Sequence, residues 1–470
     1  MRYEEYIEAG TPWCEKHPAH WQIVKFKSLF SLGKGLNITK ADLIEKGVPV
    51  ISYGQVHAKC NSGVGLNSSL FRYVDKTYAN SNEQSLVHEN DFIFADTSED
   101  REGCGNCAFV DSDLMLFAGY HSIIARNKGT ENNKYIAYQF LTDMWRYQIR
   151  SNVDGVKVFS VTKAILNKSS ILLPPREEQD QIVRYLDWKV SCINKLIHGY
   201  QRQIKLLEER YTSMVTDAVI HGIKENVRFV TADIQGFDHM PDTWETVQNK
   251  RIFRERSETS QTGTETLLSV SKRFGVKPYN ELEENEKLAT IKPAESLVGY
   301  KKVSPGNLAM NIMRARNGSY GISDYEGIVS PAYCVYELAM PTDSRYMHYL
   351  LKTPQVISLF EAYSYGICEH RRRLYAPDFL RLYLPIPPVE EQKEIADYVA
   401  VEEKKKHSLV KQLEKQIALL KEYRTRLISD VVTGQMDVRG VTVPEYVPET
   451  DEEDEEIDET LSDAGEESEV

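Results

Sequence analysis

The sequence carries one motif twice, Pro174-Pro175-Arg176-Glu177-Glu178-Gln179 and Pro387-Pro388-Val389-Glu390-Glu391-Gln392, and a long helical pattern follows each copy. The two copies lie 213 residues apart, and the helical patterns align without a gap, so that Leu196 falls on Leu409. The units of a solenoid are much shorter, because they span roughly 20–50 residues. The sequence therefore predicts two large half-molecules that are related by twofold pseudo-symmetry and are each closed by a helix.

Both helical patterns place apolar residues in alternating steps of four and three, which is the a/d seam of a coiled coil. The first seam comprises Val190, Ile193, Ile197, Tyr200, Ile204, Leu207, Tyr211, Met214 and Ala218. The second comprises Val410, Leu413, Ile417, Leu420, Leu427 and Val431, and Arg424 interrupts it where the first copy has Tyr211. Some 45 residues at 1.5 Å rise make a rod of roughly 65–70 Å. Either each rod packs on its own half, or the two rods pair, with or without a partner subunit. We expect the antiparallel pair, because neither rod buries its seam alone.

Each motif is preceded by a mixed, strand-rich pattern, which opens around Trp21 in one half and around Trp244 in the other. We predict an α+β fold in which two pseudo-symmetric globular parts are separated by two long antiparallel helices that form a coiled coil. The globular parts are residues 1–173 and 223–386, the helical regions are 174–222 and 387–436, and an acidic disordered tail covers 437–470. The loops of the two halves differ more than their scaffold, which indicates two sites that recognise different things.

Charge is unevenly distributed along the chain. The 470 residues carry a formal charge of −13, but Glu445–Val470 holds 14 acidic residues and no Lys or Arg, so the rest of the chain carries +1. Binding to nucleic acid is therefore not excluded. The tail is either a solubilising segment or a DNA-mimicking, autoinhibitory one. No run of about 18 apolar residues and no signal-peptide core is present, so we expect a cytoplasmic protein with no membrane partner.

Residue patterns for catalysis are missing from the sequence. There is no Gly-rich phosphate loop, no His-Glu-x-x-His, no nucleophile elbow and no kinase set. Cys104-Gly105-Asn106-Cys107 has the spacing of zinc ligands but has no second Cys or His pair, so it is a weak metal or redox signal. We predict that this chain has no catalytic site, no metal and no cofactor of its own.

Polar and basic residues recur in matching loops of the two halves, where they suit a DNA surface. Arg forks match guanine edges, Asn and Gln amides match adenine edges, and Lys and backbone amides match phosphates. The candidates in the first half are Lys34, Lys40, Tyr53, Gln55, Ser98, Arg101 and Lys157. Those in the second half are Lys272, Arg273, Arg314, Arg316, Asn317, Arg371, Arg372 and Arg373. Any one of them is also compatible with an ordinary solvated charge, but the set favours double-stranded DNA, a two-sided target that suits the pseudo-symmetry.

The layout of two variable globular regions, each followed by the Pro-Pro-x-Glu-Glu-Gln motif and a long helix, resembles the specificity (S) subunit of type I restriction–modification enzymes. The resemblance covers about residues 15–435 in organisation. It implies two target-recognition domains that each read one half of a bipartite DNA site, with the paired helices as a spacer. It also implies two methyltransferase (modification) subunits that bind S-adenosylmethionine, and two ATP-dependent restriction subunits, so that S-adenosylmethionine, ATP and Mg belong to the partners. The acidic tail departs from the family pattern.

Two other interpretations stay open at this point. One is a metal- or thiol-dependent hydrolase that uses Cys104 and Cys107. The other is a non-enzymatic coiled-coil DNA-binding scaffold or regulator that has no methyltransferase partners. The duplicated motif and its helices weigh against both.

Overall fold

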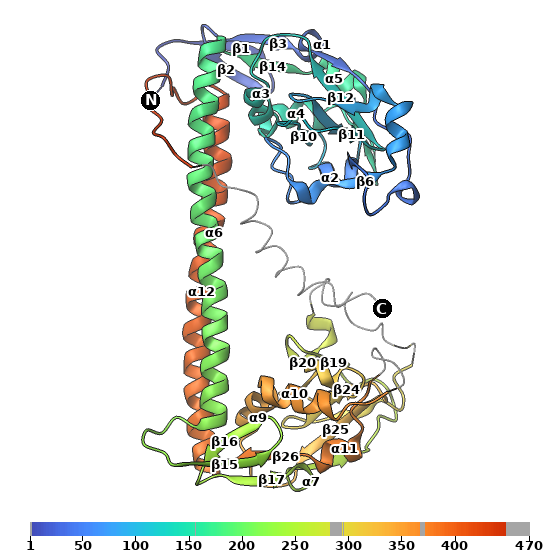
Figure 1. Cartoon of the computed structure of the whole chain (residues 1–470), viewed down its shortest axis with the longest axis vertical. Helices are drawn as coiled ribbons and strands as arrows, with labels where there is room; N and C mark the ends of the chain where they lie inside the picture. The colour runs from blue at the N-terminus through green and yellow to red at the C-terminus, as the bar shows by residue number, and fades with distance from the viewer. Residues whose placement is uncertain (1, 156, 283–293, 295, 367–371, 448–470) are drawn as a thin grey trace. The chain divides into compact units, whose positions relative to one another are not determined.

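The computed structural model describes residues 2–155, 157–282, 294, 296–366 and 372–447. The described residues divide into two compact units, the first made of residues 2–201 with 414–447 and the second of residues 202–413. Each unit holds a mixed helix-and-sheet part together with one stretch of each long helix, α6 (Arg176–His221) and α12 (Val389–Val432) (Figure 1). The mixed α and β composition that the sequence predicts is confirmed.

The first unit is built on two four-stranded sheets. One is fully antiparallel, in the order β10 (Cys107–Phe109), β8 (Phe92–Ala95), β12 (Ser122–Asn127) and β4 (Phe30–Leu32). The other has the order β6 (Arg72–Val74), β5 (Val48–Ile51), β11 (Leu116–Ala118) and β7 (Leu86–Val87), in which β5 and β11 are parallel. Three ribbons complete it: β1 (Tyr6–Thr11) with β2 (Cys14–Pro18), β9 (Thr97–Ser98) with β13 (Phe159–Ser160), and β3 (Gln22–Lys25) with β14 (Ser170–Leu173).

Short helices cover the sheets of the first unit and complete an aromatic core. The α-helices are α1 (Phe26–Leu29), α2 (Tyr53–Val56), α3 (Asn133–Phe140), α4 (Asp143–Arg150) and α5 (Lys163–Lys168). The 3-10 turns are η1 (Lys40–Asp42), η2 (Ser68–Leu70), η3 (Lys76–Asn80) and η4 (Glu83–Ser85). In the core, the Trp145 ring lies 4.3 Å from Phe140 and 5.7 Å from Phe26, centroid to centroid. Burial of such rings is the main stabilising term of a core like this one.

The second unit repeats the main antiparallel sheet, in the order β18 (Phe253–Arg256), β25 (Tyr333–Leu338), β22 (Leu308–Asn311) and β23 (Tyr320–Ile322). Its ribbons are β15 (Phe229–Ile234) with β16 (Phe237–Pro241), β17 (Glu245–Gln248) with β26 (Tyr383–Ile386), β19 (Leu268–Ser271) with β20 (Gly275–Pro278), and β21 (Lys301–Val303) with β24 (Gly327–Val329). Its helices are α7 (Asn249–Ile252), α9 (Ser344–Leu351), α10 (Pro354–Ala362) and α11 (Ala376–Arg381), with η5 (Tyr279–Glu281) and η6 (Ala315–Asn317).

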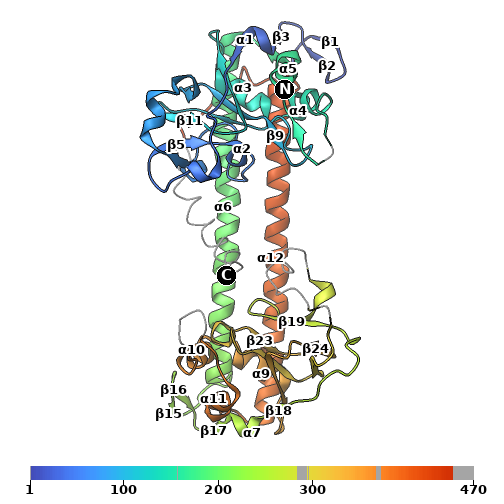
Figure 2. The same ribbon diagram turned by 90° about the vertical axis from the view of Figure 1, so that its right-hand side faces the viewer.

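The long helices lie side by side within each unit (Figures 1 and 2). In the first unit the Arg424 guanidinium donates to Asn194 Oδ1 at 2.7 Å, and in the second the Lys406 ammonium lies 4.3 Å from the centroid of the Tyr211 ring. The beginning of one helix therefore meets the end of the other, so the two run antiparallel inside each unit. Every seam residue that the sequence predicts is buried or partly buried. Arg424 stays in the seam, and its burial lowers the pKa of its guanidinium.

Candidate nucleic-acid interface

The duplicated motif ties each long helix to its globular part, and its second glutamate is the centre of the contact in the first unit. Glu178 is only 6% exposed, and its carboxylate accepts hydrogen bonds from the Tyr3 hydroxyl at 2.6 Å and from Trp21 Nε1 at 3.1 Å. His20 Nε2 lies 2.8 Å from the same carboxylate. A buried carboxylate needs several donors of this kind. The acidic first turn therefore fixes a tryptophan in addition to complementing the helix dipole.

The second unit repeats this anchor with different donors. Glu391, 4% exposed, accepts from Trp244 Nε1 at 3.2 Å and from the Lys224 ammonium at 3.1 Å. The tryptophan is common to both units, whereas the lysine takes the place of the tyrosine and histidine. The sequence alignment of Trp21 with Trp244 thus reflects one shared contact with the repeated motif.

The glutamine of each motif is fully buried and joins three elements. Gln179 donates to the carbonyl oxygen of Pro174 at 2.9 Å and accepts from the backbone amide of Asn132, the N-cap of α3, at 2.8 Å. Gln392 donates to Pro387 O and accepts from the amide of Asp343, the N-cap of α9, both at 2.9 Å. Each glutamine thereby links the segment after the last strand, the long helix and the N-terminus of α3 or α9.

Four loops of the first unit meet beside these sheets, including three that the sequence predicts to bind DNA. The Gly35 amide donates to Ser122 O at 3.2 Å, and the Tyr53 amide donates to Tyr120 O at 3.3 Å. The Asp96 amide donates to His121 O at 3.0 Å. A side chain at Gly35 would clash with the carbonyl oxygen of Gly119, so the close approach of these loops needs glycine.

An aromatic and imidazole cluster lies where the loops converge, and the sequence indicates only one of its members, Tyr53. The Tyr53 ring lies 5.7 Å from Tyr120 and 5.5 Å from His121, centroid to centroid. His121 Nδ1 lies 3.1 Å from Asp96 Oδ1, and the His121 side chain is 58% exposed. His121 has a φ of +53°, a conformation that is uncommon outside glycine. Aromatic and imidazole groups can stack on bases or hydrogen-bond to them, and here the tyrosines are partly buried whereas His121 is exposed.

The other predicted residues of the first unit fall into two groups. Lys34, Lys40, Lys157 and Arg101 are exposed, and Arg101 also donates to the carbonyl oxygen of Arg150 at 2.8 and 3.0 Å. Gln55 lies at the start of α2, where its Oε1 accepts from the Ser52 amide at 3.1 Å. Ser98 is only 2% exposed, because it lies in β9 paired with Phe159. A buried hydroxyl cannot reach a base edge, so we leave Ser98 out of the proposed surface.

Cys104 and Cys107 are both buried, and burial raises the pKa of the Cys107 thiol to about 12. Reactive and metal-binding cysteines are thiolates, so this raised pKa weighs against a thiol-dependent hydrolase. Within residues 2–447, apart from the segments outside the description, no three His, Cys, Asp or Glu side chains are grouped as metal ligands. In the same part of the chain, no helix has both the length and the apolar character that a membrane crossing requires.

The predicted segments of the second unit also come together. The Lys352 ammonium donates to the carbonyl oxygens of Lys272 at 3.3 Å and Gly318 at 2.7 Å. The Leu374 amide donates to the carbonyl oxygen of Ile312 at 3.0 Å. The β19–β20 turn, the 312–318 loop and the segment after residue 371 therefore form one surface, although they are far apart in the sequence.

The predicted side chains of this surface differ in their exposure. Lys272, Arg273 and Arg314 are exposed, whereas Arg316, Asn317 and Arg373 are partly buried. Arg372 is also partly buried, and its guanidinium donates to the carbonyl oxygens of Ser364 at 3.1 Å and Glu361 at 3.2 Å. Arg371 lies outside the described residues.

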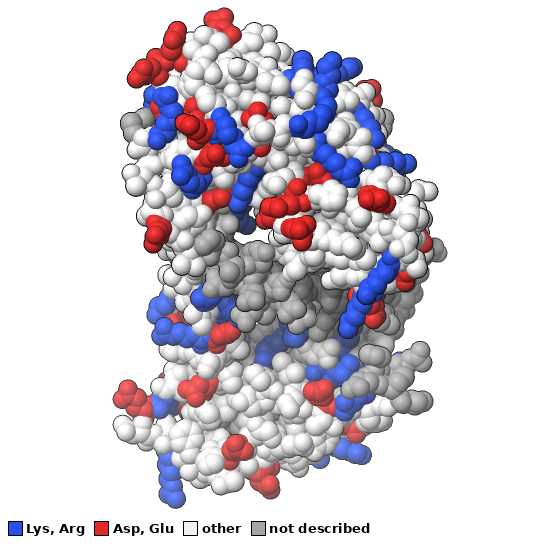
Figure 3. Space-filling model, turned by 45° about the horizontal axis from the view of Figure 1, so that its top comes forward, with Lys and Arg blue, Asp and Glu red and all other residues white. Residues whose placement is uncertain are grey.

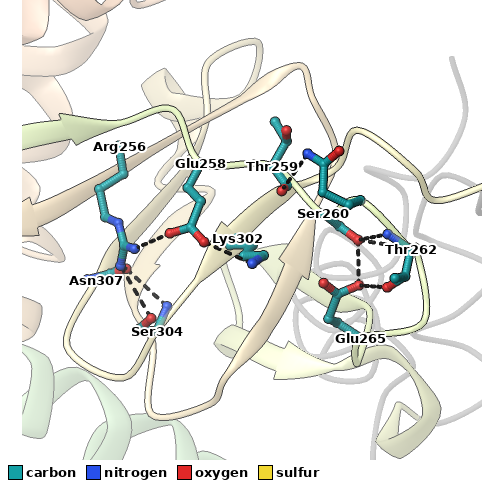
Figure 4. Close-up of polar contacts among 11 residues, drawn as sticks. Arg256, Glu258, Thr259, Ser260, Thr262, Glu265, Lys302, Ser304 and Asn307 are labelled. Carbon is teal, nitrogen blue, oxygen red and sulfur yellow. Dashed lines mark hydrogen bonds and ion pairs between the residues drawn. The ribbon is translucent and has the colours of Figure 1, made fainter.

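A separate charged network beside the β18–β25–β22–β23 sheet is paired within the unit (Figure 4). Arg256 donates to Glu258 at 2.7 Å, and Lys302 donates to the same carboxylate at 2.8 Å. These bonds lower the pKa of Glu258 and raise that of Lys302. Figure 3 likewise shows blue and red side chains interspersed on its face of each unit. At the loop clusters, Lys272 and Arg314 have no such carboxylate partner among the described residues. These side chains are therefore better candidates to contact DNA than Arg256 and Lys302.

Comparison with known proteins finds similarity to the DNA specificity subunits of type I restriction systems. Residues 18–206 match the family model of the type I restriction modification DNA specificity domain. Two relatives from Methanocaldococcus jannaschii are the type I restriction enzyme MjaVIII specificity subunit, 22% identical, and the putative type I restriction enzyme MjaX specificity subunit, 24% identical. The first alignment covers 77% of this chain and 82% of the relative, and the second covers 86% and 93%.

A solved structure agrees at the level of the fold. It is described as the structural basis of complex assembly and conformational transition of the type I R-M system, and it matches with a TM-score of 0.60 at 15% identity. The match covers 89% of this chain and 99% of the solved one. The chain is therefore similar to type I restriction enzyme specificity subunits over most of its length.

Proposed function

We propose that this chain is the non-catalytic subunit that reads a bipartite double-stranded DNA site for a type I restriction–modification complex. The observation that carries the proposal is that each unit gathers its predicted polar loops into one cluster, on a scaffold that is anchored by the same motif. Equivalent scaffolds with unlike loops suit two half-sites of unlike sequence, because base edges are distinguished by side-chain donors and acceptors.

The division of labour follows the predicted boundaries. Residues 1–173 and 223–386 form the two target-recognition domains, and 174–222 with 387–436 form an antiparallel coiled coil that separates them and sets the gap between half-sites. The antiparallel contacts inside each unit support this arrangement. The candidates for contacting DNA are the residues that the sequence predicts and the structure describes. Ser98 is left out because it is buried, and His121 is added because it is exposed in the same loop cluster.

Exposed leucines on the long helices support docking of two equal partner subunits. Leu196 and Leu419 in the first unit are 52% and 48% exposed, and Leu409 and Leu206 in the second are 46% and 56% exposed. They lie beside the seam, at its g and c positions, so each unit presents the same apolar pair. A helix that laid an apolar face on such a pair would complete a small bundle.

We assign these two faces to two methyltransferase subunits, which bind S-adenosylmethionine and methylate adenine. Two restriction subunits, which use ATP and Mg, would join the assembled complex. The chain itself would supply recognition and assembly.

The decisive experiment compares genome-wide adenine methylation in cells with and without the gene. A single bipartite motif should disappear when the gene is deleted. Co-purification from the native host should also recover a methyltransferase. An unchanged methylation pattern would contradict the proposal, and recovery of a DNA-binding chain without any methyltransferase would favour a scaffold or regulator.

A further inference from the structure

Lys352 is a cation at the centre of the predicted surface of the second unit, and the sequence pattern does not indicate it. It follows α9 as the C-cap residue, and its ammonium lies beneath the loops. Two of its three N–H groups are engaged by the carbonyl oxygens of Lys272 and Gly318. The ammonium also lies 5.1 Å from the centroid of the Tyr320 ring.

The contacts of Lys352 join two loops that are otherwise far apart in the sequence. Lys272 belongs to the β19–β20 turn, and Gly318 ends η6, which carries Arg316 and Asn317. Because Gly318 has a φ of +84°, its carbonyl oxygen is directed by a left-handed turn that glycine adopts readily. A side chain that could not donate to both carbonyl oxygens would lose both hydrogen bonds, including the partly buried one to Gly318.

The charge of Lys352 has no carboxylate partner among the residues that the structure describes. The charged group that acts on it electrostatically is another cation, Lys272. Burial and the charge of Lys272 lower the pKa of Lys352 to about 8. A partly buried ammonium with a cationic neighbour is stabilised when an anion arrives.

The first unit shows that the fold does not need a lysine here. Its equivalent residue is Leu141, the C-cap of α3, which is likewise followed by a threonine that begins the next helix. Leu141 packs against Gly63, where an added side chain would meet it. The scaffold therefore accepts leucine at this point, so the lysine serves something that is particular to the second unit.

We propose that Lys352 is the positioning residue of the second unit, which holds the 271–274 turn and the 314–318 loop together as one DNA-contacting surface and for which duplex DNA supplies the missing counter-anion. This inference rests on the proposed function. The inference also means that DNA binding by the second unit depends on the protonation of Lys352, since DNA phosphates would keep its ammonium charged.

The dependence should show between pH 7 and pH 9. If DNA retains the proton that the free chain loses with a pKa of about 8, affinity falls by up to about tenfold over this interval. The other groups that face Lys352 do not change charge there. Burial holds the pKa of His348 on α9 at about 4 and raises that of Tyr320 on β23.

The test uses the full chain with its native methyltransferase and a duplex that contains the mapped site. Lys352→Leu copies the first unit, and Lys352→Arg keeps a charge at every pH. We expect Lys352→Leu to weaken binding about tenfold at pH 7, to relax the second half-site only and to lose the added pH dependence. Lys352→Arg should keep the second half-site and also lose that pH dependence. Lys250→Leu, which removes an exposed lysine of α7 in the same unit, is the matched control for charge alone.

The outcomes separate this inference from the proposed function. If the wild-type chain reads no bipartite motif, the proposed function fails. If the wild type reads one and Lys352→Leu leaves both half-sites and the pH profile unchanged, the positioning role is wrong. Relaxation of both half-sites alike would also overturn it, and retention of the first half-site shows that the variant is folded.

Discussion

Changing the length of the long helices should change the gap between the half-sites and leave the half-sequences intact. If the register set by the Asn194–Arg424 and Tyr211–Lys406 contacts continues from one unit into the other, residues 199–205 of α6 pair with 412–418 of α12. These two stretches are also equivalent by the repeat, and each is one heptad. Removing or multiplying both together keeps the a/d seam in register and leaves all four exposed leucines in place.

The magnitude follows from helix geometry. One heptad is about 10.5 Å at 1.5 Å per residue, which corresponds to about three base pairs when one turn of 10–10.5 base pairs spans about 34 Å. Three base pairs also rotate the DNA by about 100°, whereas a heptad returns the seam to nearly the same orientation. Removing one heptad from each helix should therefore have one of two results. Either the gap becomes shorter and the DNA or the helix pair is twisted to bring the half-site back into contact, or specific methylation is lost.

Adding three heptads to each helix is the sharper perturbation. It lengthens the pair by about 31 Å, or about nine base pairs, and brings the second half-site back to within about 40° of the original face of the DNA. Mapping of adenine methylation should then show a gap longer by nine or ten base pairs with both half-sequences retained. An unchanged gap, or altered half-sequences around the original gap, would refute the role of the helices as a spacer.

Three further perturbations test the anchors, the buried titrating group and the docking faces. Gln392→Ala leaves two backbone groups unpaired and should lower the free energy of unfolding of the second unit by about 2–4 kcal/mol in urea denaturation. Burial lowers the pKa of His348 from 6.5 to about 4, so the unfolded chain binds the extra proton between these values. Stability should therefore be unaffected by this group above pH 6.5 and fall by up to about 3 kcal/mol as pH drops to 4, and His348→Ala, which copies Ala137 of the first unit, should remove that slope. Leu196→Asp with Leu409→Asp should abolish co-purification of the methyltransferase while the isolated chain keeps its DNA affinity in a binding titration.

The elements that repeat a short-range pattern could be predicted from the sequence. The steps of three and four identify every seam residue, because the same face of a helix must be buried along its whole length. Even Arg424 stays in the seam, where its long side chain reaches Asn194. The polar loops were predicted as sets, since turn residues and cations stand out between strands.

The details of each loop cluster depend on contacts between distant segments, which no local pattern reports. Ser98 has a surface-like sequence, yet pairing of β9 with β13 buries it. No motif surrounds His121 in the sequence, and its positive φ and its contact with Asp96 are visible only in the folded chain. Lys352 follows an amphipathic helix like any solvated lysine, and its role depends on two carbonyl oxygens that lie 80 and 34 residues away.

The pseudo-symmetry is completed by the two ends of the chain. In the second unit α6 runs through Gly222 directly into the β15–β16 ribbon that precedes Trp244, and Gly222 lies against that tryptophan. In the first unit the same place is filled by the end of α12, where Gly434 lies against Pro18 and Trp21 and its carbonyl oxygen accepts from the Tyr6 hydroxyl at 2.8 Å.

The β1–β2 ribbon thus contacts the C-terminal end of α12, as the β15–β16 ribbon follows and packs near the C-terminal end of α6. Both units therefore present the same tryptophan, glutamate and helix end, so a difference between the half-sites has to arise in the parts that are not repeated, which are the loops and residues beneath them such as Lys352.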